Sequence, residues 1–167
     1  MEIIFKKIEL NEKDKVLMLF KKAAEKISKI NVDHWQYWKN PPIEKIKWVE
    51  EGLLNNEFFF INNIDGNNIG MVRILNEDFL YWGKQEERAI YVHSLVVKEE
   101  YEGNSLGKLI LQTIEADAKS KNYKYLRLDA DSKNPKLCNY YLKLGFQKIG
   151  EKELSLSIYN LYQKELV

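Results

Sequence analysis

A strand, a tight turn and a helix follow one another without interruption from Ile90 onward, and this succession constrains the fold more than any other part of the chain. Residues 90–97 form the apolar run Ile-Tyr-Val-His-Ser-Leu-Val-Val, which is typical of a buried strand. From Leu106 the apolar residues recur at helical spacing, and a further strand is predicted over residues 123–130. A helix between two strands implies a parallel pair joined by a right-handed crossover, so this region predicts an α/β sheet.

The turn between that strand and that helix contains small residues that suit a phosphate group. Residues 102–108 read Glu-Gly-Asn-Ser-Leu-Gly-Lys. The first N–H groups of a helix have no partner inside the helix, and they lie at the positive end of its dipole. Such a turn can bind phosphate through its main chain, with Asn104 or Ser105 capping the helix. An ordinary capped loop has the same composition, so the turn alone identifies no ligand.

The size and charge of the chain indicate one domain without a polyanionic partner. The chain has 167 residues and a formal net charge of +1. This length suffices for one hydrophobic core and is short for two, so we expect a single domain over residues 1–167. A nearly neutral charge argues against nucleic-acid binding.

Cysteine use and hydropathy indicate a reducing compartment. Cys138 is the only cysteine, which excludes an internal disulfide and a cysteine-based metal site, and we expect no metal. No segment approaches the roughly 20 apolar residues that a spanning helix needs. The first residues alternate like a strand and do not resemble a signal peptide. We therefore expect a cytoplasmic protein without membrane contact.

The rest of the chain divides into helical and strand patterns. Asp65-Gly66-Asn67-Asn68 is a turn signal between two apolar segments and predicts a hairpin. Pro41-Pro42 opens a helix, and an aromatic segment without a clear period precedes it. The predicted elements are strand 3–10, helix 11–30, helix 43–54, strands 57–64 and 69–75, strand 88–97, helix 106–118, strand 123–130, helix 134–144, and strands 146–150 and 155–162.

A second motif follows the strand at residues 123–130. Residues 134–146 read Asn-Pro-Lys-Leu-Cys-Asn-Tyr-Tyr-Leu-Lys-Leu-Gly-Phe. Asn134, Tyr141 and the pair Gly145-Phe146 follow one another in this order. In this the segment resembles the cofactor half of the GNAT superfamily of acyl-CoA-dependent N-acetyltransferases. Leu137, Tyr141 and Leu144 are also spaced to lie on one face of a helix, so the alternative is that they only pack in the hydrophobic core.

The turn matches this family in part. The family signature is Arg or Gln, two residues, Gly, one residue, then Gly or Ala, whereas residues 102–107 read Glu-Gly-Asn-Ser-Leu-Gly. Gly107 matches strictly, Gly103 lies where the family often has glycine, and Ser105 replaces the first signature glycine. A carboxylate at Glu102 would repel a diphosphate by about 1 kcal/mol at about 4 Å in water, so we expect Glu102 to point outward.

The resemblance implies a fold and a cofactor. The fold is a mixed, mostly antiparallel central sheet of six to seven strands flanked by helices, with a split between strands 4 and 5. The cofactor is acetyl-CoA, whose diphosphate binds the turn and whose pantetheine arm binds the fourth strand and Asn134. The residues implied to bind acetyl-CoA are Leu95, Val96, Val97, Gly103, Asn104, Ser105, Leu106, Gly107, Lys108, Asn134 and Tyr141.

The resemblance also implies acetyl transfer to a primary amine of a small molecule or peptide, by direct attack in a ternary complex. Tyr141 then lies beside the thioester sulfur and protonates it or donates a hydrogen bond to it, and His93 is the candidate base for the amine. Since Tyr91, His93 and Leu95 share one face of the predicted strand, His93 is also explained as a hydrogen-bonded interior residue. Cys138 has no histidine near it in sequence and is a poor covalent nucleophile.

Aromatic and acidic residues are candidates for the acceptor site. The family binds the acceptor near the first two helices and the loops around strands three and four, where aromatic walls suit an amine. A carboxylate at a strand end can bind a cationic amine, although such positions, and that of Asp78, also carry turn-forming aspartates. The candidate acceptor residues are Trp35, Trp38, Trp82 and Asp129; alternatively, the rings complete the core. We expect a monomer or a homodimer.

Two other functions are compatible with the sequence. A noncatalytic acyl-CoA-binding or sensing module would keep the fold, with Glu102 and Ser105 marking a weakened site. A dinucleotide-type phosphate binder requires a glycine-rich turn after the first strand, which the chain lacks. Thermal stabilisation by acetyl-CoA or NAD, followed by turnover with amines, separates the three functions.

Overall fold

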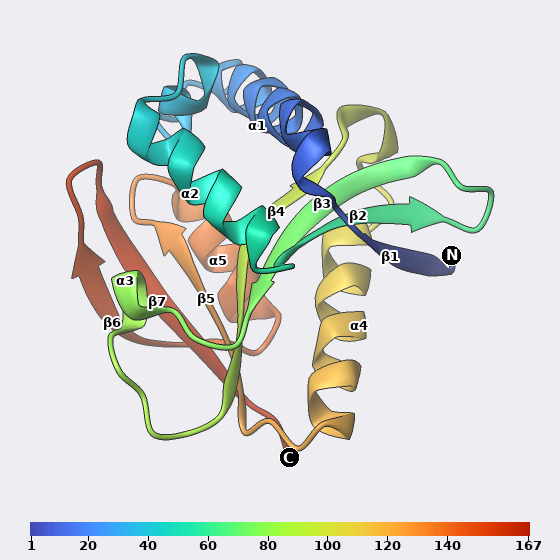
Figure 1. Ribbon diagram of the computed structural model, residues 1–167. Coiled ribbons are helices and arrows are strands. Elements are labelled where there is room, and N and C mark those ends of the chain that lie inside the picture. Colours follow the sequence, from blue (N-terminus) through green and yellow to red (C-terminus); the bar gives the residue numbers. More distant parts are fainter. The chain divides into compact units, whose positions relative to one another are not determined.

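The computed structural model describes residues 1–167, which form two compact units (Figure 1). The first unit contains residues 1–74 and 94–107, and the second contains residues 75–93 and 108–167. Elements of the first unit are β1 (Ile3–Lys7), α1 (Lys13–Ser28), α2 (Ile43–Leu54), β2 (Phe58–Asn63), β3 (Asn68–Leu75, except its last residue), and the 3-10 turns Leu10–Glu12, Gln36–Lys39 and Glu99–Tyr101. Elements of the second are α3 (Phe79–Trp82), β5 (Tyr125–Asp131), α5 (Pro135–Lys143), β6 (Gln147–Glu153) and β7 (Ile158–Glu165). Besides β3, β4 (Ala89–Val97) and α4 (Leu106–Ser120) contribute residues to both units.

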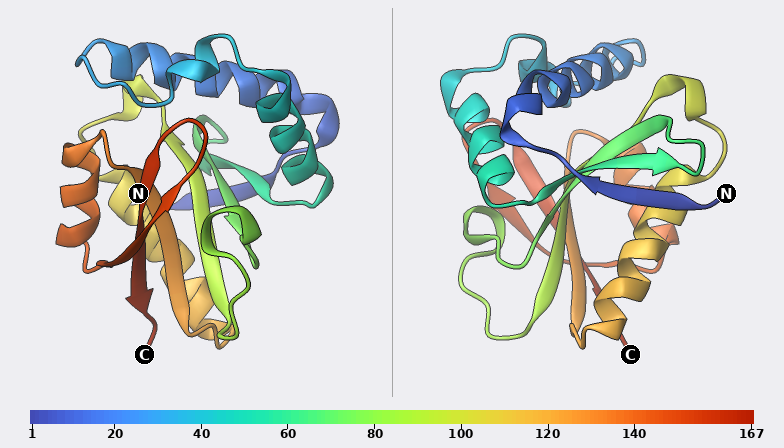
Figure 2. Two further views of the ribbon diagram at one scale, coloured as in Figure 1. Left: turned by 90° about the vertical axis from the view of Figure 1, so that its left-hand side faces the viewer. Right: turned by 45° about the vertical axis from the view of Figure 1, so that its right-hand side comes forward.

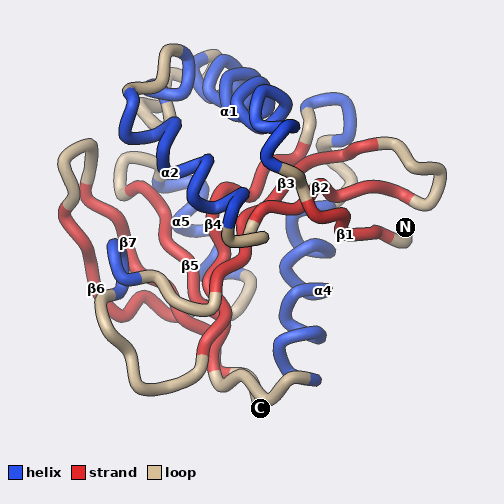
Figure 3. Tube along the Cα trace, in the orientation of Figure 1, coloured by secondary structure: helices blue, strands red, loops and turns tan.

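The strands have the order β1-β2-β3-β4-β5-β7-β6 (Figure 3). β4 and β5 are parallel, whereas β2 pairs antiparallel with β1 and β3, and β7 pairs antiparallel with β5 and β6. The ladder between β4 and β5 joins Ala89–Val92 to Tyr125–Leu128, and both strands continue beyond it. The prediction of a mixed, mostly antiparallel sheet with a split between the fourth and fifth strands is confirmed.

The core of the first unit lies between its two long helices and β2 and β3 (Figure 2). Phe20 of α1 stacks on Trp38 with ring centroids 3.9 Å apart, and Val49 of α2 and Phe58 of β2 are fully buried beside them. Such buried rings and aliphatic side chains are the main source of stability in a small core. The apolar side of α1 therefore packs in the same core as the buried residues of β2 and β3.

Gly70 allows β3 to approach the second half of β4. A Cβ atom at this position would lie 2.0 Å from the carbonyl oxygen of Val96. No side chain fits into that distance, so the close pairing requires glycine here.

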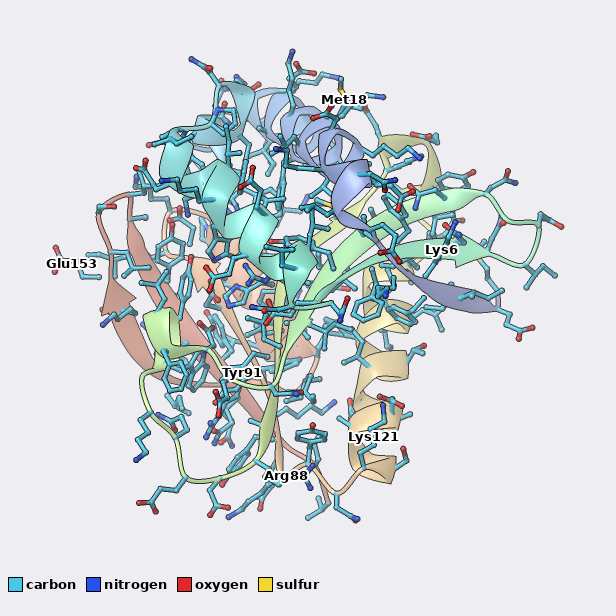
Figure 4. All side chains as sticks on the ribbon, in the orientation of Figure 1. Lys6, Met18, Arg88, Tyr91, Lys121 and Glu153 are labelled. Atoms are coloured by element: carbon cyan, nitrogen blue, oxygen red, sulfur yellow. The ribbon has the colours of Figure 1, made fainter.

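The second unit packs α4 and α5 against its strands. Leu126, Leu128 and Ala130 alternate along β5 and are buried, as expected for one face of a strand. The Lys164 ammonium on β7 lies 2.8 Å from the Glu115 carboxylate on α4. At the end of α4, Arg88 donates a hydrogen bond to the carbonyl of Lys121 at 3.2 Å (Figure 4).

Several predicted boundaries are wrong. The last strands, expected at residues 146–150 and 155–162, are Gln147–Glu153 and Ile158–Glu165. β7 pairs with β5 as far as Glu165, and this pairing keeps polar residues in a strand that the pattern of apolar residues does not predict. The first helix begins two residues later than expected, after a 3-10 turn, and the first strand ends at Lys7. No helix is both long and apolar enough to cross a membrane.

Ser94 interrupts the alternation of side chains along β4. Its φ angle is 56°, which lies in the left-handed region and not in extended backbone. The period of two that placed Leu95 and Val97 on the face of His93 therefore does not extend past Ser94.

Candidate active site

Three titratable side chains, Asp78, His93 and Asp129, form a compact group inside the second unit, which we call the carboxylate–histidine cluster. His93 Nε2 lies 2.6 Å from Asp78 Oδ2, and His93 Nδ1 lies 3.0 Å from Asp129 Oδ2. The three side chains are 8%, 5% and 9% exposed in the order His93, Asp78, Asp129. The imidazole thus lies between two carboxylates that are largely buried.

The parallel strands position two members of this cluster. Tyr91 of β4 is the register partner of Arg127 of β5. His93 and Asp129 lie two residues beyond these partners, and side chains two residues apart share a face of a strand. The register therefore brings His93 and Asp129 together just after the last paired residues of β4 and β5, where the ladder ends.

A short helix positions the third member. Asp78 is the N-cap of α3, and its Oδ1 accepts a hydrogen bond from the Tyr81 N–H at 3.3 Å. Aspartate is favoured at this place because its carboxylate accepts from the first N–H groups of a helix. The Tyr81 ring lies 4.7 Å from the His93 ring, and the Tyr159 ring lies 5.2 Å from that of Tyr81. The cap thus fixes the carboxylate, and aromatic rings pack beside the imidazole.

Tyr141 of α5 lies within electrostatic reach of this cluster. Its side chain is buried, and burial raises the pKa of Tyr141, which the neighbouring Asp129 carboxylate raises further. The hydroxyl is therefore neutral at physiological pH and available as a hydrogen-bond donor. Of the predicted site residues, the structure brings Tyr141, Asp129 and His93 together in one unit.

Asn134, the N-cap of α5, and Cys138, on that helix, both have structural partners. The Asn134 side-chain oxygen accepts a hydrogen bond from the Leu137 N–H at 3.1 Å and caps α5. The Cys138 sulfur lies 3.7 Å from the Asp131 carbonyl oxygen and 3.5 Å from Asn160 Nδ2. No histidine is among these neighbours of Cys138.

The predicted diphosphate turn lies in the first unit and has an unusual backbone. Gly103 has a φ of 79° and Ser105 a φ of 55°. An N-cap residue typically has an extended backbone, so the conformation of Ser105, directly before α4, is unusual for the helix cap that was predicted at Asn104 or Ser105. Asn104 donates its side-chain amide to the carbonyl oxygens of Tyr101 and Glu102 at 3.1 and 3.4 Å, so its amide stabilises the turn.

Glu102, the residue that departs from the family signature, is ion-paired with Lys26 of α1. Both side chains are partly exposed. The ammonium offsets the carboxylate charge beside the turn, which reduces the repulsion expected between Glu102 and an anion.

Of the predicted acceptor-site tryptophans, Trp38 and Trp82 are buried in their own units, and Trp35 is partly buried against the core of the first unit. Trp38 is buried against Phe20, and the edge of Trp35 meets Phe20 with ring centroids 5.6 Å apart. Trp82 is buried against Tyr91, with ring centroids 5.7 Å apart. This packing is the alternative that the sequence left open, in which the rings complete the core.

Asp78 and Arg127 are buried polar residues of the second unit that are not among the predicted site residues. Asp78 carried no assigned role, and its place before the aromatic run 79–82 was a capping signal. Arg127 on β5 donates to Tyr91 Oη and Gln163 Oε1, both at 2.8 Å, and its guanidinium lies over the Trp82 ring. A single arginine in an apolar strand gave no signal beyond its polarity.

Comparisons with known proteins agree with this architecture. A family model described as the acetyltransferase (GNAT) family matches residues 24–146. YesJ of Bacillus subtilis, described as an uncharacterized N-acetyltransferase, is 30% identical over 90 residues, which are 53% of this chain and 48% of YesJ. The chain therefore aligns with about half the length of YesJ.

Solved structures show the same fold along nearly the whole chain. An acetyltransferase of the GNAT family from Listeria monocytogenes has a TM-score of 0.79 at 22% identity, covering 99% of this chain and 96% of that one. The spermidine N-acetyltransferase of Vibrio cholerae, solved with CoA and spermine, has a TM-score of 0.65 at 12% identity, covering 98% and 95%. The likeness at these identities is one of fold.

Proposed function

Because the chain belongs to the acetyltransferase (GNAT) family, we propose that it transfers the acetyl group of acetyl-CoA to a primary amine of a small molecule or peptide, by direct attack in a ternary complex. The observation that supports this most strongly is the carboxylate–histidine cluster with Tyr141 in its field. Acetyl transfer needs a group that takes a proton from the amine and a group that stabilises the departing thiolate, and the second unit contains both kinds.

Acetyl transfer to an ammonium substrate removes two protons from its nitrogen. An ammonium substrate loses one proton to the carboxylate–histidine cluster, and the free amine attacks the thioester carbon. The carbon–sulfur bond then breaks, the second nitrogen proton is released to solvent, and the sulfur leaves as a thiolate that accepts a hydrogen bond from the Tyr141 hydroxyl. Because burial raises the pKa of Tyr141 far above the value near 8.5 of an ordinary thiol, Tyr141 stabilises the thiolate as a hydrogen-bond donor.

We assign the diphosphate of acetyl-CoA to the main chain of residues 103–108, and its pantetheine arm to Leu95–Val97 and Asn134. Left-handed residues such as Gly103 and Ser105 turn successive N–H groups toward one side, and such amide nests bind anions. The Lys26 partner of Glu102 supports the same assignment. We place the protein in the cytoplasm, as a monomer or homodimer.

The acceptor assignment follows from the charge of the cluster. Two carboxylates against one imidazole attract a cationic amine, so Asp129 is the proposed contact for the substrate. We retain Trp35, Trp38 and Trp82 as candidate residues around the acceptor. Polyamines belong in the substrate panel because a structural neighbour was solved with spermine.

Two measurements, made one after the other, test this function. Acetyl-CoA is expected to raise the melting temperature and NAD is not, because only the former has a thioester arm to fill the site. With a panel of amines, thiol release is then expected from the wild type, and about a hundredfold less from Tyr141→Phe. Tyr140→Phe, on the same helix, is the matched control. Stabilisation without thiol release from any amine would instead identify a noncatalytic acyl-CoA-binding module.

A further inference from the structure

We propose that Asp131 and Ser157 are positioning residues, which hold the connection between β5 and α5 so that Asn134 and Tyr141 meet acetyl-CoA in the right geometry. We call this connection, residues 131–134, the β5–α5 corner. Neither Asp131 nor Ser157 is proposed to touch the cofactor or the amine. The effect on acetyl-CoA rests on the proposed function, whereas the hold on the corner does not.

The side chain of Asp131 joins two separate segments at the end of β5. The residue is 4% exposed, and its Oδ1 accepts hydrogen bonds from the Lys133 N–H at 3.0 Å and from the Ser157 hydroxyl at 2.7 Å. The first bond closes a turn, because aspartate commonly bonds the main chain two residues on. Burying a carboxylate costs free energy unless hydrogen-bond donors replace the lost water. The two bonds therefore account for an acidic residue at this buried place.

The main chain of the β5–α5 corner has partners in both neighbouring elements. The Asp131 carbonyl oxygen accepts a hydrogen bond from the Asn134 N–H at 2.9 Å and lies 3.7 Å from the Cys138 sulfur. The Ser132 N–H donates to the Ile158 carbonyl oxygen at 3.0 Å. The corner is thus bonded to the start of α5 and to the start of β7.

Ser157 brings the turn between β6 and β7 into this arrangement. The Leu154 N–H donates to the Ser157 carbonyl oxygen at 2.9 Å, which closes the turn over residues 154–157. The hydroxyl of Ser157 then reaches Asp131, from which it is 26 residues distant in the sequence. Ser155 lies in the same turn with an exposed side chain. A comparison of the two serines therefore isolates the bond to Asp131 from other effects of a serine in this turn.

The corner determines where the proposed cofactor residues lie. Asn134 is the N-cap of α5, and its carbonyl oxygen accepts a hydrogen bond from the Cys138 N–H at 3.1 Å. Tyr141 follows on the same helix, and its ring lies beside that of Tyr162 with centroids 5.9 Å apart. A change in the direction of α5 at its first turn moves Asn134 and Tyr141 together. Misplacement of a reacting group by about 1 Å can lower a rate about a hundredfold, so bonds outside the site can control turnover.

Amide hydrogen exchange measures the hold on the corner without any ligand. In Ser157→Ala we expect the Asn134 and Leu137 amide protons to exchange about fivefold faster than in the wild type, because the first turn of α5 opens more often. Ser157→Thr, which keeps a hydroxyl, should restore the slower exchange. Ser155→Ala is the matched control and should leave both rates unchanged. Equal exchange rates in the wild type and in Ser157→Ala would overturn the proposal.

Binding and turnover measure the consequence for the proposed reaction. We expect Ser157→Ala to raise the Kd for acetyl-CoA about fivefold in calorimetry and to lower kcat about tenfold, with the KM for the amine unchanged. Ser157→Thr should recover both values, and Ser155→Ala should retain them. A Ser157→Ala protein with faster exchange but with wild-type Kd and kcat would refute the positioning role.

Two substitutions at Asp131 separate hydrogen bonding from charge. An amide oxygen still accepts from the Lys133 N–H and the Ser157 hydroxyl, so Asp131→Asn is expected to keep Kd and kcat within about twofold of the wild type. Asp131→Ala accepts neither bond and should show at least the defect of Ser157→Ala. Equal defects in Asp131→Asn and Asp131→Ala would contradict the proposal. A wild type that binds no acetyl-CoA would refute the acetyl transfer itself, whereas the exchange rates would still decide whether Ser157 holds the corner.

Discussion

At the scale of single residues, Tyr141 shows how burial sets the chemistry of a side chain. The same hydroxyl on an exposed helix would exchange its proton with water near pH 10. Inside the second unit, burial and the Asp129 charge raise the pKa of Tyr141 and keep the phenol neutral. A hydrogen-bond donor that cannot readily ionise suits a site where negative charge develops on sulfur.

The raised pKa of Tyr141 predicts a loss of stability in alkaline solution. The folded protein holds this proton to higher pH than the unfolded chain, in which tyrosine ionises near pH 10. The contribution is therefore complete below about pH 10 and falls above it, by up to about 1.4 kcal/mol per pH unit. Urea unfolding at about pH 9 and about pH 11 should show a smaller loss in Tyr141→Phe than in the wild type. Tyr162, whose pKa burial raises to about 12, is present in both proteins. Equal losses in the two proteins would contradict this prediction.

Local sequence patterns found two members of the carboxylate–histidine cluster and passed over the third. His93 and Asp129 lie on strands with a strong pattern of apolar residues. Their place near the ends of paired strands therefore followed from the spacing of these residues and from the order of the predicted elements. Asp78 reaches His93 only because α3 packs back toward β4, and such a contact depends on tertiary structure that no short window contains. Its capping position was visible in the sequence, but its partner was not.

At the scale of elements, the end of α1 is joined to the residues before the predicted diphosphate turn by two ion pairs. Lys26 pairs with Glu102, and Lys29 lies 3.5 Å from Glu99. Exposed pairs of this kind contribute at most about 1 kcal/mol to stability. Their importance lies in the local field at the turn, where an uncompensated Glu102 would repel an anion.

This pairing predicts a coupled effect on acetyl-CoA affinity. Lys26→Gln is expected to weaken binding about three- to tenfold, because it leaves the Glu102 charge beside the diphosphate. The double variant Lys26→Gln/Glu102→Gln should bind like the wild type or better, as measured by calorimetry. Lys29→Gln serves as the control on the same helix. A double variant as weak as Lys26→Gln alone would show that Lys26 acts in another way.

The observed element boundaries agree with the predicted ones where the apolar periodicity is strong. They differ where hydrogen bonding between strands determines how far a strand extends. The hairpin of β2 and β3 and the long helices were predicted close to their observed places. β7 extends to Glu165 through polar residues, because its hydrogen bonds to β5 do not depend on apolar side chains. The left-handed conformation of Ser94 also left no mark in the sequence, since serine seldom adopts it.

At the scale of the whole molecule, the fold is far better conserved than the sequence. The Listeria and Vibrio structures match nearly the whole chain at 22% and 12% identity. A fold can persist at this level because binary patterning and turn residues tolerate many side chains. Function has to be argued from the particular charges that each chain buries, and here these are Asp78, His93, Asp129 and Arg127.

Arg127 supplies the last prediction, because it contributes a charge to this buried group without pairing directly with a carboxylate. Its guanidinium donates to Tyr91 and Gln163 and lies over the rings of Trp82 and Tyr125. Arg127→Met preserves much of the side-chain volume and removes the cation. We expect it to lower the free energy of unfolding by about 3 kcal/mol, as measured by urea denaturation.

The origin of that loss is tested by a double-variant cycle. If Arg127 stabilises the fold by balancing buried negative charge, adding Asp129→Asn should reduce the cost of Arg127→Met by about 1 kcal/mol or more. Arg88→Met, which removes an exposed arginine stacked on Tyr123, is the matched control and should cost little in either background. Strictly additive losses for Arg127→Met and Asp129→Asn would mean that Arg127 acts through packing alone, because independent sites do not share an electrostatic energy.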